Sequence, residues 1–218
     1  MDFRFNNEII IPVETVTVKG ELIIPLKAKA IIIFSHGSGS SRFSRRNRMV
    51  AQYLQRKNFG TLLFDLLTEE EDVHYQNRFD IELLTKRLSG ATLWLEKLPA
   101  AKDCRIGYFG ASTGAASALR AAAIMPQTGA VVSRGGRPDL AMEVLAKVNS
   151  PTLLIVGGSD YDVLQMNKEA YTRLKCEKKL EVVEGASHLF EEPGKMDIVS
   201  ALAANWFEKY LNPVAAHV

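Results

Sequence analysis

The chain has 218 residues, of which 47% are hydrophobic and 24% are charged, a composition typical of an ordinary globular protein. Its 27 basic and 25 acidic residues give a formal net charge of +2, a balance too even to favour a nucleic-acid or membrane surface. We therefore expect neither partner, and we expect a single domain over residues 1–218.

The cysteines and the amino terminus favour a cytoplasmic protein. Cys104 and Cys176 are too few for a disulfide framework in a chain of this length, and they lack the spacing of metal ligands. The first residues lack the basic start and apolar run of a signal peptide, and no apolar stretch approaches the length of a membrane span. We expect a cytoplasmic protein without a metal, and these patterns leave open whether it is a monomer or a homodimer.

The first elements in the chain are predicted to be strands. Residues 8–24 favour an antiparallel pair of short strands, with a turn at Lys19-Gly20. Six apolar runs rich in β-branched residues follow, each too short for a helix. Runs of this kind suit strands that are covered on both faces, as in a parallel sheet. They occupy residues 30–35, 61–65, 105–109, 130–133, 152–156 and 179–183.

Longer segments with helical spacing lie between these strands. In the second of them, apolar side chains recur every three or four residues, as in a helix packed on a sheet. The alternation predicts an α/β fold, with a mostly parallel central sheet, an antiparallel N-terminal hairpin and helices on both faces. Ligands of such sheets bind beyond the carboxyl ends of the strands. The predicted helices cover residues 44–58, 78–98, 113–125, 138–147, 162–175 and 195–211.

A nucleophile motif follows the strand predicted at 105–109. The stretch Gly110-Ala111-Ser112-Thr113-Gly114 has the Gly-x-Ser-x-Gly pattern between a strand and a helix of small residues. The glycines allow a tight turn in which the serine adopts a strained backbone conformation. We predict Ser112 as the nucleophile, with the Thr113 amide aimed at a developing oxyanion. A purely structural turn, or one that cradles a phosphate, is the alternative.

A serine nucleophile needs a base, and the base needs a carboxylate to orient it. We predict His188 as the base, because it follows the last predicted strand and should lie at the carboxyl edge of the sheet. Asp160 closes the turn after the preceding strand and is preferred as the acid. Asp162 is the alternative, at the start of a helix where acids are common caps. Asp65 is a weaker rival because it precedes the nucleophile, whereas the order Ser112, Asp160, His188 is that of α/β-hydrolases.

The second part of an oxyanion hole is predicted after an earlier strand. His36-Gly37-Ser38-Gly39 follows the strand at 30–35, and its glycines allow backbone amides to approach an oxyanion closely. We assign the amide of Ser38 to the hole, with Gly39 as the near alternative. We expect His36 to organise this loop rather than to titrate during catalysis.

Five stretches of the chain resemble the dienelactone hydrolase family of α/β-hydrolases, and within it a branch of small bacterial hydrolases. The resemblance implies the α/β-hydrolase fold, hydrolysis without a metal or organic cofactor, and catalytic roles for Ser112, Asp160 and His188. Relatives of this kind also occur joined to a phosphoribosyltransferase-like domain, for which we expect no room in this chain. The likeness runs over nearly the whole chain, and the stretches are residues 36–42, 64–68, 107–114, 133–140 and 188–194.

The nucleophile differs from that of dienelactone hydrolase itself, which is known for a cysteine at the position of Ser112. We therefore do not predict dienelactone as the substrate. We expect a carboxylesterase-like enzyme that hydrolyses a small-molecule ester through an acyl-enzyme. An acyltransferase or a peptidase would use the same intermediate, and a non-catalytic ligand-binding protein with this fold is a further alternative.

Two groups of arginines are candidates for substrate binding. Arg42, Arg45, Arg46 and Arg48 form a cluster after the predicted oxyanion loop, of which we choose Arg42 as the candidate. Arg134 and Arg137 follow the strand at 130–133. Guanidinium groups at the carboxyl edge of the sheet could bind a carboxylate or a phosphate of an acidic substrate. The alternative is that these arginines are solvated or paired with acids of the protein.

Overall fold

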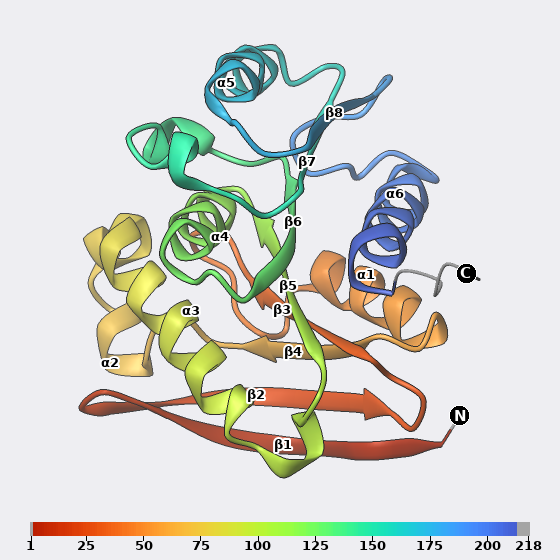
Figure 1. The fold of residues 1–218 in the computed structure, drawn as a ribbon. Coiled ribbons are helices and arrows are strands. Elements are labelled where there is room, and N and C mark those ends of the chain that lie inside the picture. The colour runs from red at the N-terminus through yellow and green to blue at the C-terminus, as the bar shows by residue number, and fades with distance from the viewer. Residues whose placement is uncertain (1, 213–218) are drawn as a thin grey trace.

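The computed structural model describes residues 2–212, which form an eight-stranded sheet (Figure 1). The strand order is β1-β2-β4-β3-β5-β6-β7-β8. β1 pairs antiparallel with β2, and β2 with β4, whereas all pairs from β4 to β8 are parallel. The strands are β1 (Phe3–Val13), β2 (Val16–Pro25), β3 (Ala30–Ser35), β4 (Gly60–Phe64), β5 (Arg105–Ala111), β6 (Thr128–Arg134), β7 (Thr152–Gly157) and β8 (Lys178–Val183).

Helices cover both faces of this sheet (Figure 1). α1 and α6 lie against one face, and α3, α4 and α5 lie against the other. The predicted α/β fold, with its mostly parallel sheet and antiparallel hairpin, is confirmed. No helix within residues 2–212 is long and apolar enough to cross a membrane. The helices are α1 (Arg45–Arg56), α2 (Glu69–Asp72), α3 (Ile81–Glu96), α4 (Thr113–Ile124), α5 (Tyr161–Arg173) and α6 (Lys195–Leu211).

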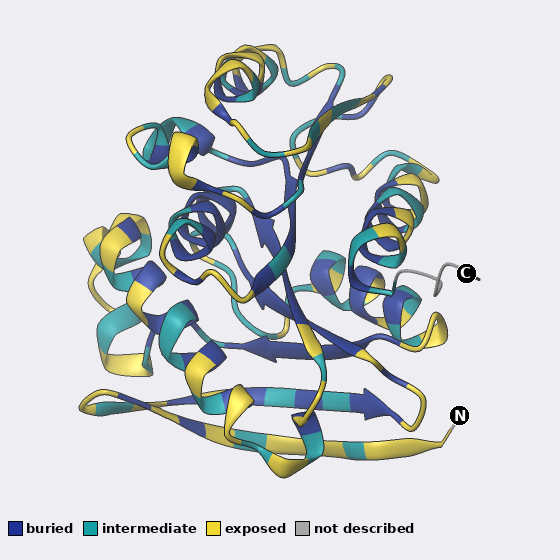
Figure 2. Ribbon diagram, viewed as in Figure 1, coloured by how far each residue is buried: buried dark blue, intermediate teal, exposed yellow. Residues whose placement is uncertain are grey.

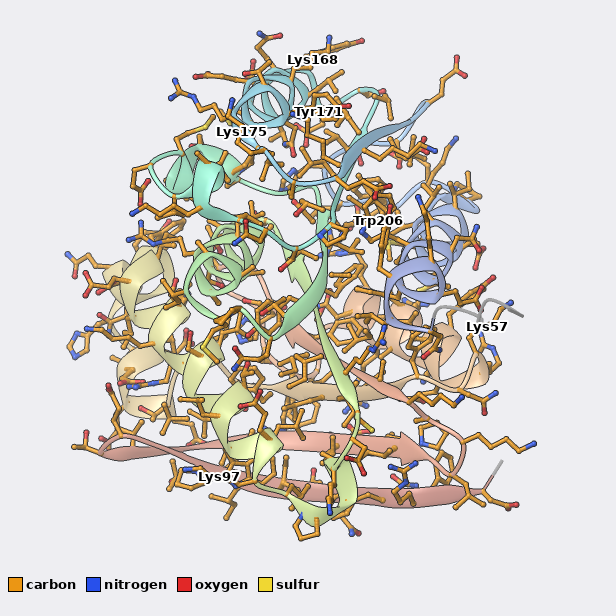
Figure 3. The ribbon with its side chains drawn as sticks, in the orientation of Figure 1. Lys57, Lys97, Lys168, Tyr171, Lys175 and Trp206 are labelled. Carbon is orange, nitrogen blue, oxygen red and sulfur yellow. The ribbon has the colours of Figure 1, made fainter. Side chains whose placement is uncertain are left out.

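The core lies in two layers, one on each side of the central strands, and Figure 2 shows these strands mostly in the colour of buried residues. All six residues of β3 are buried, which explains why its sequence is apolar throughout rather than alternating. On the face covered by α1 and α6, the Lys57 ammonium at the end of α1 lies 3.7 Å from the Glu208 carboxylate on α6. Trp206 of α6 donates its indole N–H to the Pro151 carbonyl at 3.2 Å (Figure 3). The first contact joins α1 to α6, and the second joins α6 to the residue that precedes β7.

The N-terminal hairpin turns earlier than the sequence predicts. The turn lies at Glu14-Thr15, where Glu14 has a φ of 52°. The predicted turn at Lys19-Gly20 is wrong, because both residues lie within β2 and pair with β1. A Cβ at Gly20 would lie 3.0 Å from the Phe64 Cβ on the neighbouring strand. Gly20 therefore allows close side-chain packing between strands, a role that a sequence pattern does not separate from a turn.

The predicted helix at 138–147 is also wrong. This segment forms two short 3₁₀ helices, at Pro138–Ala141 and Leu145–Lys147. Arg137 precedes the first of them and makes no side-chain capping hydrogen bond, so the segment lacks a strong helix start. Tight turns of this kind still bury Ala141 and Leu145 in the core.

The strand order reverses at β3, and this reversal locates the site. The chain leaves β3 for β4 on one side of it and later returns to β5 on the other side. In open α/β sheets, the loops that leave two such neighbouring strands diverge and leave a crevice beyond their carboxyl ends. The loops after β3 and β5 carry the predicted oxyanion residues and Ser112.

Candidate active site

Ser112 occupies a strained turn between β5 and α4. Its backbone has φ 52° and ψ −121°, a combination with positive φ that side-chain-bearing residues rarely adopt. The two motif glycines have no room for a side chain. A Cβ at Gly110 would lie 2.4 Å from the Ala115 Cα, and one at Gly114 would lie 2.2 Å from the Ser35 carbonyl oxygen. Glycines at these two positions therefore allow α4 to pack closely against the sheet.

Backbone contacts hold this turn beside the end of β6. The Ser112 amide donates to the Arg134 carbonyl at 3.2 Å, and the Arg137 amide donates to the Ser112 carbonyl at 3.1 Å. Thr113 is the first residue of α4, a position whose amide has no partner within the helix. This amide and the positive end of the α4 dipole therefore come immediately after Ser112 in the chain.

His188 and Asp160 are brought together from two strand ends. The His188 Nδ1 lies 2.6 Å from the Asp160 Oδ2, and the Asp160 side chain is 15% exposed. Asp160 follows β7, and His188 lies in the loop after β8. The alternative Asp162 is an exposed residue in the first turn of α5. The rival Asp65 instead pairs with the Arg42 guanidinium, and it accepts the Arg42 amide at 2.8 Å.

Glycines bring the loops that carry His188 and Asp160 close to one another and to β6. Gly135 has φ 51°, and a Cβ there would lie 3.2 Å from the His188 carbonyl oxygen. A Cβ at Gly157 would lie 2.4 Å from the carbonyl oxygen of Ala186 in the histidine loop. Phe190 is 1% exposed and has a φ of 56°, an unusual conformation for a bulky residue. The loop that positions His188 is therefore tightly packed and partly strained.

Ser112 and His188 line the same pocket, which has a volume of about 250 Å³. The pocket lies at the carboxyl edge of the sheet, where the loops after β3, β5, β6 and β8 meet the first turn of α1. No aspartate or glutamate is among its lining residues within 2–212. Those that bear on the chemistry are Gly37, Ser38, Arg46, Ser112, Arg134 and His188.

The loop after β3 packs directly against the Ser112 turn. A Cβ at Gly37 would lie 3.2 Å from the Ser112 Cβ. The Ser38 amide, predicted to bind an oxyanion, donates to the Thr113 hydroxyl at 2.8 Å in this conformation. Ser38 lines the pocket, whereas the alternative Gly39 is not among the lining residues found within 2–212.

His36 holds this loop as a neutral ring. Its Nδ1 donates to the Gly37 carbonyl at 3.0 Å, and its Nε2 accepts the Leu66 amide hydrogen at 3.1 Å. Burial lowers the pKa of His36 below 6.5, and the bond to Gly37 offsets only part of this effect. The arrangement agrees with the predicted organising role.

The three predicted substrate-binding arginines separate into two kinds. Arg42 pairs with Asp65, and Arg137 makes two hydrogen bonds to Asp139, at 2.8 and 2.7 Å. Neither is among the residues that line the Ser112 pocket in the described chain. Arg134 does line it and is 4% exposed.

From the sequence, Arg46 belongs to a basic cluster but is not among the predicted substrate-binding residues, and Asn47 is not predicted at all. Both lie in the first turn of α1 and line the pocket. A signal was present, because Arg45, Arg46 and Arg48 stand at the start of a helix that has no acid in its first turn. Cations are unfavourable at that end of a helix, so such a pattern suggests a functional reason.

Neither cysteine lines this pocket in the described chain. Across residues 2–212, no cluster of three or more histidine, cysteine, aspartate or glutamate side chains could hold a metal ion. Cys104 and Cys176 are unbridged and partly buried, and burial raises the pKa of both thiols.

The curated relatives include a putative phosphoribosyl transferase of Mycobacterium tuberculosis. The chain is 54% identical to it over 198 residues, with the same figures in strains CDC 1551 / Oshkosh and ATCC 25618 / H37Rv. The match covers 90% of this chain and 44% of the relative. The chain therefore spans less than half the length of these relatives.

Solved structures and the family comparison point to one fold and one family. Dienelactone hydrolase from Anabaena variabilis ATCC 29413 is 51% identical, with a TM-score of 0.93 over 95% of this chain and 98% of that one. The Pyrococcus furiosus esterase Pf2001 is 18% identical, with a TM-score of 0.81 over 95% and 92%, a likeness that shows the fold alone. The dienelactone hydrolase family matches residues 18–216. This chain is therefore an α/β-hydrolase that belongs to the dienelactone hydrolase family.

Proposed function

We propose that this hydrolase cleaves carboxylic esters through a triad of Ser112, His188 and Asp160. One observation carries the proposal. The His188 Nδ1 lies 2.6 Å from the Asp160 carboxylate, and His188 shares a pocket with the strained Ser112. A base that is oriented by a carboxylate and shares a pocket with a serine hydroxyl is the arrangement that activates a serine nucleophile.

The tautomer of His188 follows from its partner. A carboxylate accepts hydrogen bonds, so Nδ1 carries the proton and Nε2 has the free lone pair. In the proposed cycle, Nε2 takes the Ser112 proton as the serine oxygen attacks the ester carbonyl. The imidazolium gives that proton to the leaving alcohol, which leaves an acyl group on Ser112. A water molecule, activated by the same nitrogen, then releases the acid and restores the serine.

The proposed oxyanion hole consists of the Thr113 and Ser38 amides. The Thr113 amide stands at the start of α4, which favours developing negative charge. The Ser38 amide already donates to the Thr113 hydroxyl, so its role requires that it share or exchange this bond when substrate binds. A donor of this kind contributes a factor of roughly 10²–10³ to the rate of related enzymes.

The name of the mycobacterial relatives suggests a second candidate activity, phosphoribosyl transfer. Only 44% of those relatives aligns with this chain, and residues 18–216 match a hydrolase family. We therefore propose hydrolysis for this chain and do not assign phosphoribosyl transfer to it. Acyl transfer to an alcohol or amine, and peptide hydrolysis, would use the same acyl-enzyme. A non-catalytic ligand-binding role is the remaining alternative.

Covalent labelling tests the nucleophile. A fluorophosphonate probe should add once to the folded protein, and Ser112→Ala should abolish the adduct. Ser89→Ala is a matched control, because Ser89 lies on α3 and lines a different hollow. Labelling that persists in Ser112→Ala, or that never occurs, would contradict the catalytic proposal.

A substrate panel tests the reaction class. Nitrophenyl esters, peptide amides, and esters supplied with an alcohol or amine acceptor should be compared with the same two variants. Ester hydrolysis that depends on Ser112 and outpaces both amide cleavage and acyl transfer is the expected result. A dominant transfer product would replace the hydrolase with an acyltransferase.

We also propose a cytoplasmic setting. Its support is the pair of unbridged thiols, Cys104 and Cys176, which a reducing compartment would maintain. Fractionation of the source cells, with detection by antibody, tests this location.

A further inference from the structure

The start of α1 violates the usual charge preference of a helix. Its first four residues include Arg45, Arg46 and Arg48, and no acid lies in its first turn. The positive end of a helix dipole disfavours cations, so these residues do not stabilise the helix by themselves. Arg48 is compensated by Glu21 at 2.6 Å, and Arg45 is exposed to solvent. Arg46 instead lines the Ser112 pocket.

Arg134 reaches the same place from β6 and is almost completely buried. It is 4% exposed, and no acidic side chain of residues 2–212 forms an ion pair with it. Its Nε has no hydrogen-bond partner in the described chain. Its Nη2 lies 3.5 Å from the Asn47 Oδ1, in the first turn of α1, and its guanidinium carbon lies 5.9 Å from the centroid of the Phe190 ring. A buried charge with so few partners is costly unless something else compensates it.

Arg46 and Arg134 affect one another electrostatically. Burial, followed by the positive charge of Arg46, lowers the pKa of Arg134 to about 10. Arg134 therefore remains protonated at neutral pH. Arg46 has one acidic partner, the exposed Glu191 at 3.2 Å, and its own Nε is buried without a partner among the described residues. The pocket thus carries two guanidinium charges and little compensating negative charge.

We propose that Arg134, Arg46 and the first turn of α1 form an oxyanion-binding subsite, which holds a carboxylate or phosphate group at the far end of the substrate's acyl chain. This inference rests on the proposed ester hydrolysis and adds a substrate class to it, an ester of a short acid that bears a second negative group. The helix terminus and the buried unpaired guanidinium are independent observations that favour an anion at one place.

The size of the pocket limits the substrate. Ser112, His188, Arg46 and Arg134 all line a hollow of about 250 Å³. Pockets for drug-sized ligands are typically about 300–1,000 Å³. The anionic group and the ester carbonyl are therefore separated by a few carbon atoms, and a long acyl chain does not fit between them.

Two esters with acyl chains of equal length test the subsite. Nitrophenyl hemiadipate ends in a carboxylate, whereas nitrophenyl hexanoate ends in a methyl group. The protein should prefer the first, and Arg134→Met should reduce kcat/KM for it by about 10- to 100-fold, mainly through KM. Turnover of the hexanoate ester should fall less than that of the hemiadipate ester, so the ratio of the two kcat/KM values reports the subsite. Arg45→Gln removes an equal charge outside the pocket and is the matched control, with a change of about twofold or less expected from screened charge.

Glu191→Gln tests the same subsite with a change that should strengthen anion binding rather than weaken it. The altered side chain is exposed. Glu191 neutralises Arg46, so its removal should lower KM for the hemiadipate ester by about two- to fivefold and leave the hexanoate ester unchanged. This variant keeps the inference testable if Arg134→Met does not fold. An unchanged or raised KM would contradict a role for Arg46.

Binding measurements separate this inference from the proposed reaction. Adipate and inorganic phosphate should each stabilise the protein against thermal unfolding, and Arg134→Met should lose this effect. An ester whose acyl chain ends in a phosphonate then shows which anion is preferred. Ester turnover without any preference for anionic chains would overturn the subsite and leave the hydrolase intact. Anion binding that depends on Arg134, without turnover of any ester, would overturn the reaction and leave the subsite intact.

Discussion

Two hollows of this protein differ in size and in chemistry. The larger, about 730 Å³, lies between the turn of the N-terminal hairpin, α3 and α4, and it is lined by residues such as Val13, Leu93 and Ile124. The smaller, about 250 Å³, lies at the carboxyl edge of the sheet beside Ser112. The larger is a groove between packed elements, whereas several loops converge on the smaller. Convergence of polar groups, rather than volume, identifies the candidate site.

The reason for this difference lies in the sheet. Parallel strands end at one edge, so residues far apart in the sequence, such as Ser112, Asp160 and His188, gather there. The groove lies instead along one face of the fold. The histidines of residues 2–212 are absent from its lining, so its serine, Ser89, has no imidazole in the groove to act as its base.

The largest expected effect tests the contrast between the two hollows directly. Ser112→Ala should reduce kcat/KM for a nitrophenyl ester by roughly 10⁴-fold or more, because the acyl-enzyme no longer forms. Ser89→Ala in the larger groove should leave kcat/KM within about twofold. Steady-state assays on freshly purified variants provide the measurement. Equal losses in both variants would remove the distinction between the hollows.

A somewhat smaller effect is expected at Asp160. Asp160→Asn keeps the size of the side chain but favours the wrong tautomer of His188, so kcat should fall by about 10³- to 10⁴-fold. The matched control is Asp162→Asn, an exposed change two residues away in α5. If Asp162→Asn proves the more damaging, the acid of the triad has been assigned to the wrong residue.

The sequence predicted the strands that end at the candidate site better than the hairpin and the irregular segments. Ser112 and Asp160 lie at strand ends that local patterns locate, because a buried parallel strand is apolar throughout and stops at a polar turn. The turn at Lys19-Gly20 was wrong because a glycine can serve a turn or a close strand contact, and only the neighbouring Phe64 distinguishes them. The 3₁₀ turns at 138–147 have a helical spacing but no cap.

The pairing of charges could not be predicted from the sequence. Arg134 and Arg137 are three residues apart and follow the same strand, yet Arg137 pairs with Asp139 and Arg134 is buried without an acid among the described residues. Which arginine turns towards the pocket depends on the path of the backbone after β6 and on the approach of α1. Neither is encoded in a local pattern.

A third prediction concerns the stability of the larger groove. Gly90 of α3 lines it, and a Cβ there would lie 2.3 Å from the Val13 Cγ1. Gly90→Ala should therefore lower the free energy of unfolding by about 1–3 kcal/mol. The double variant with Val13→Ala should recover part of that loss, and kcat of the folded fraction should be unchanged in both. Urea denaturation with activity assays measures the two quantities, and a fall in kcat would connect the groove to the reaction.

The smallest predicted effect is a pH dependence of stability at the edge of the candidate site. Burial holds the pKa of His36 below 6.5, so the unfolded chain takes up a proton at a higher pH than the folded one. Stability is therefore fully present above pH 6.5 and decreases as the pH falls from 6.5 towards the folded pKa. The slope from this one group is at most about 1.4 kcal/mol per pH unit.

The variant His36→Asn isolates this contribution. It loses the bond to the Leu66 amide, so it should be less stable by about 1 kcal/mol at pH 7. Its free energy of unfolding should decrease less steeply than that of the unchanged protein between pH 6.5 and 5, because one proton-linked group is absent. Urea denaturation across this range measures both slopes. His74→Asn, at an exposed histidine, should keep the original slope, and a His36→Asn slope as steep as the original would mean that His36 is not held neutral by burial.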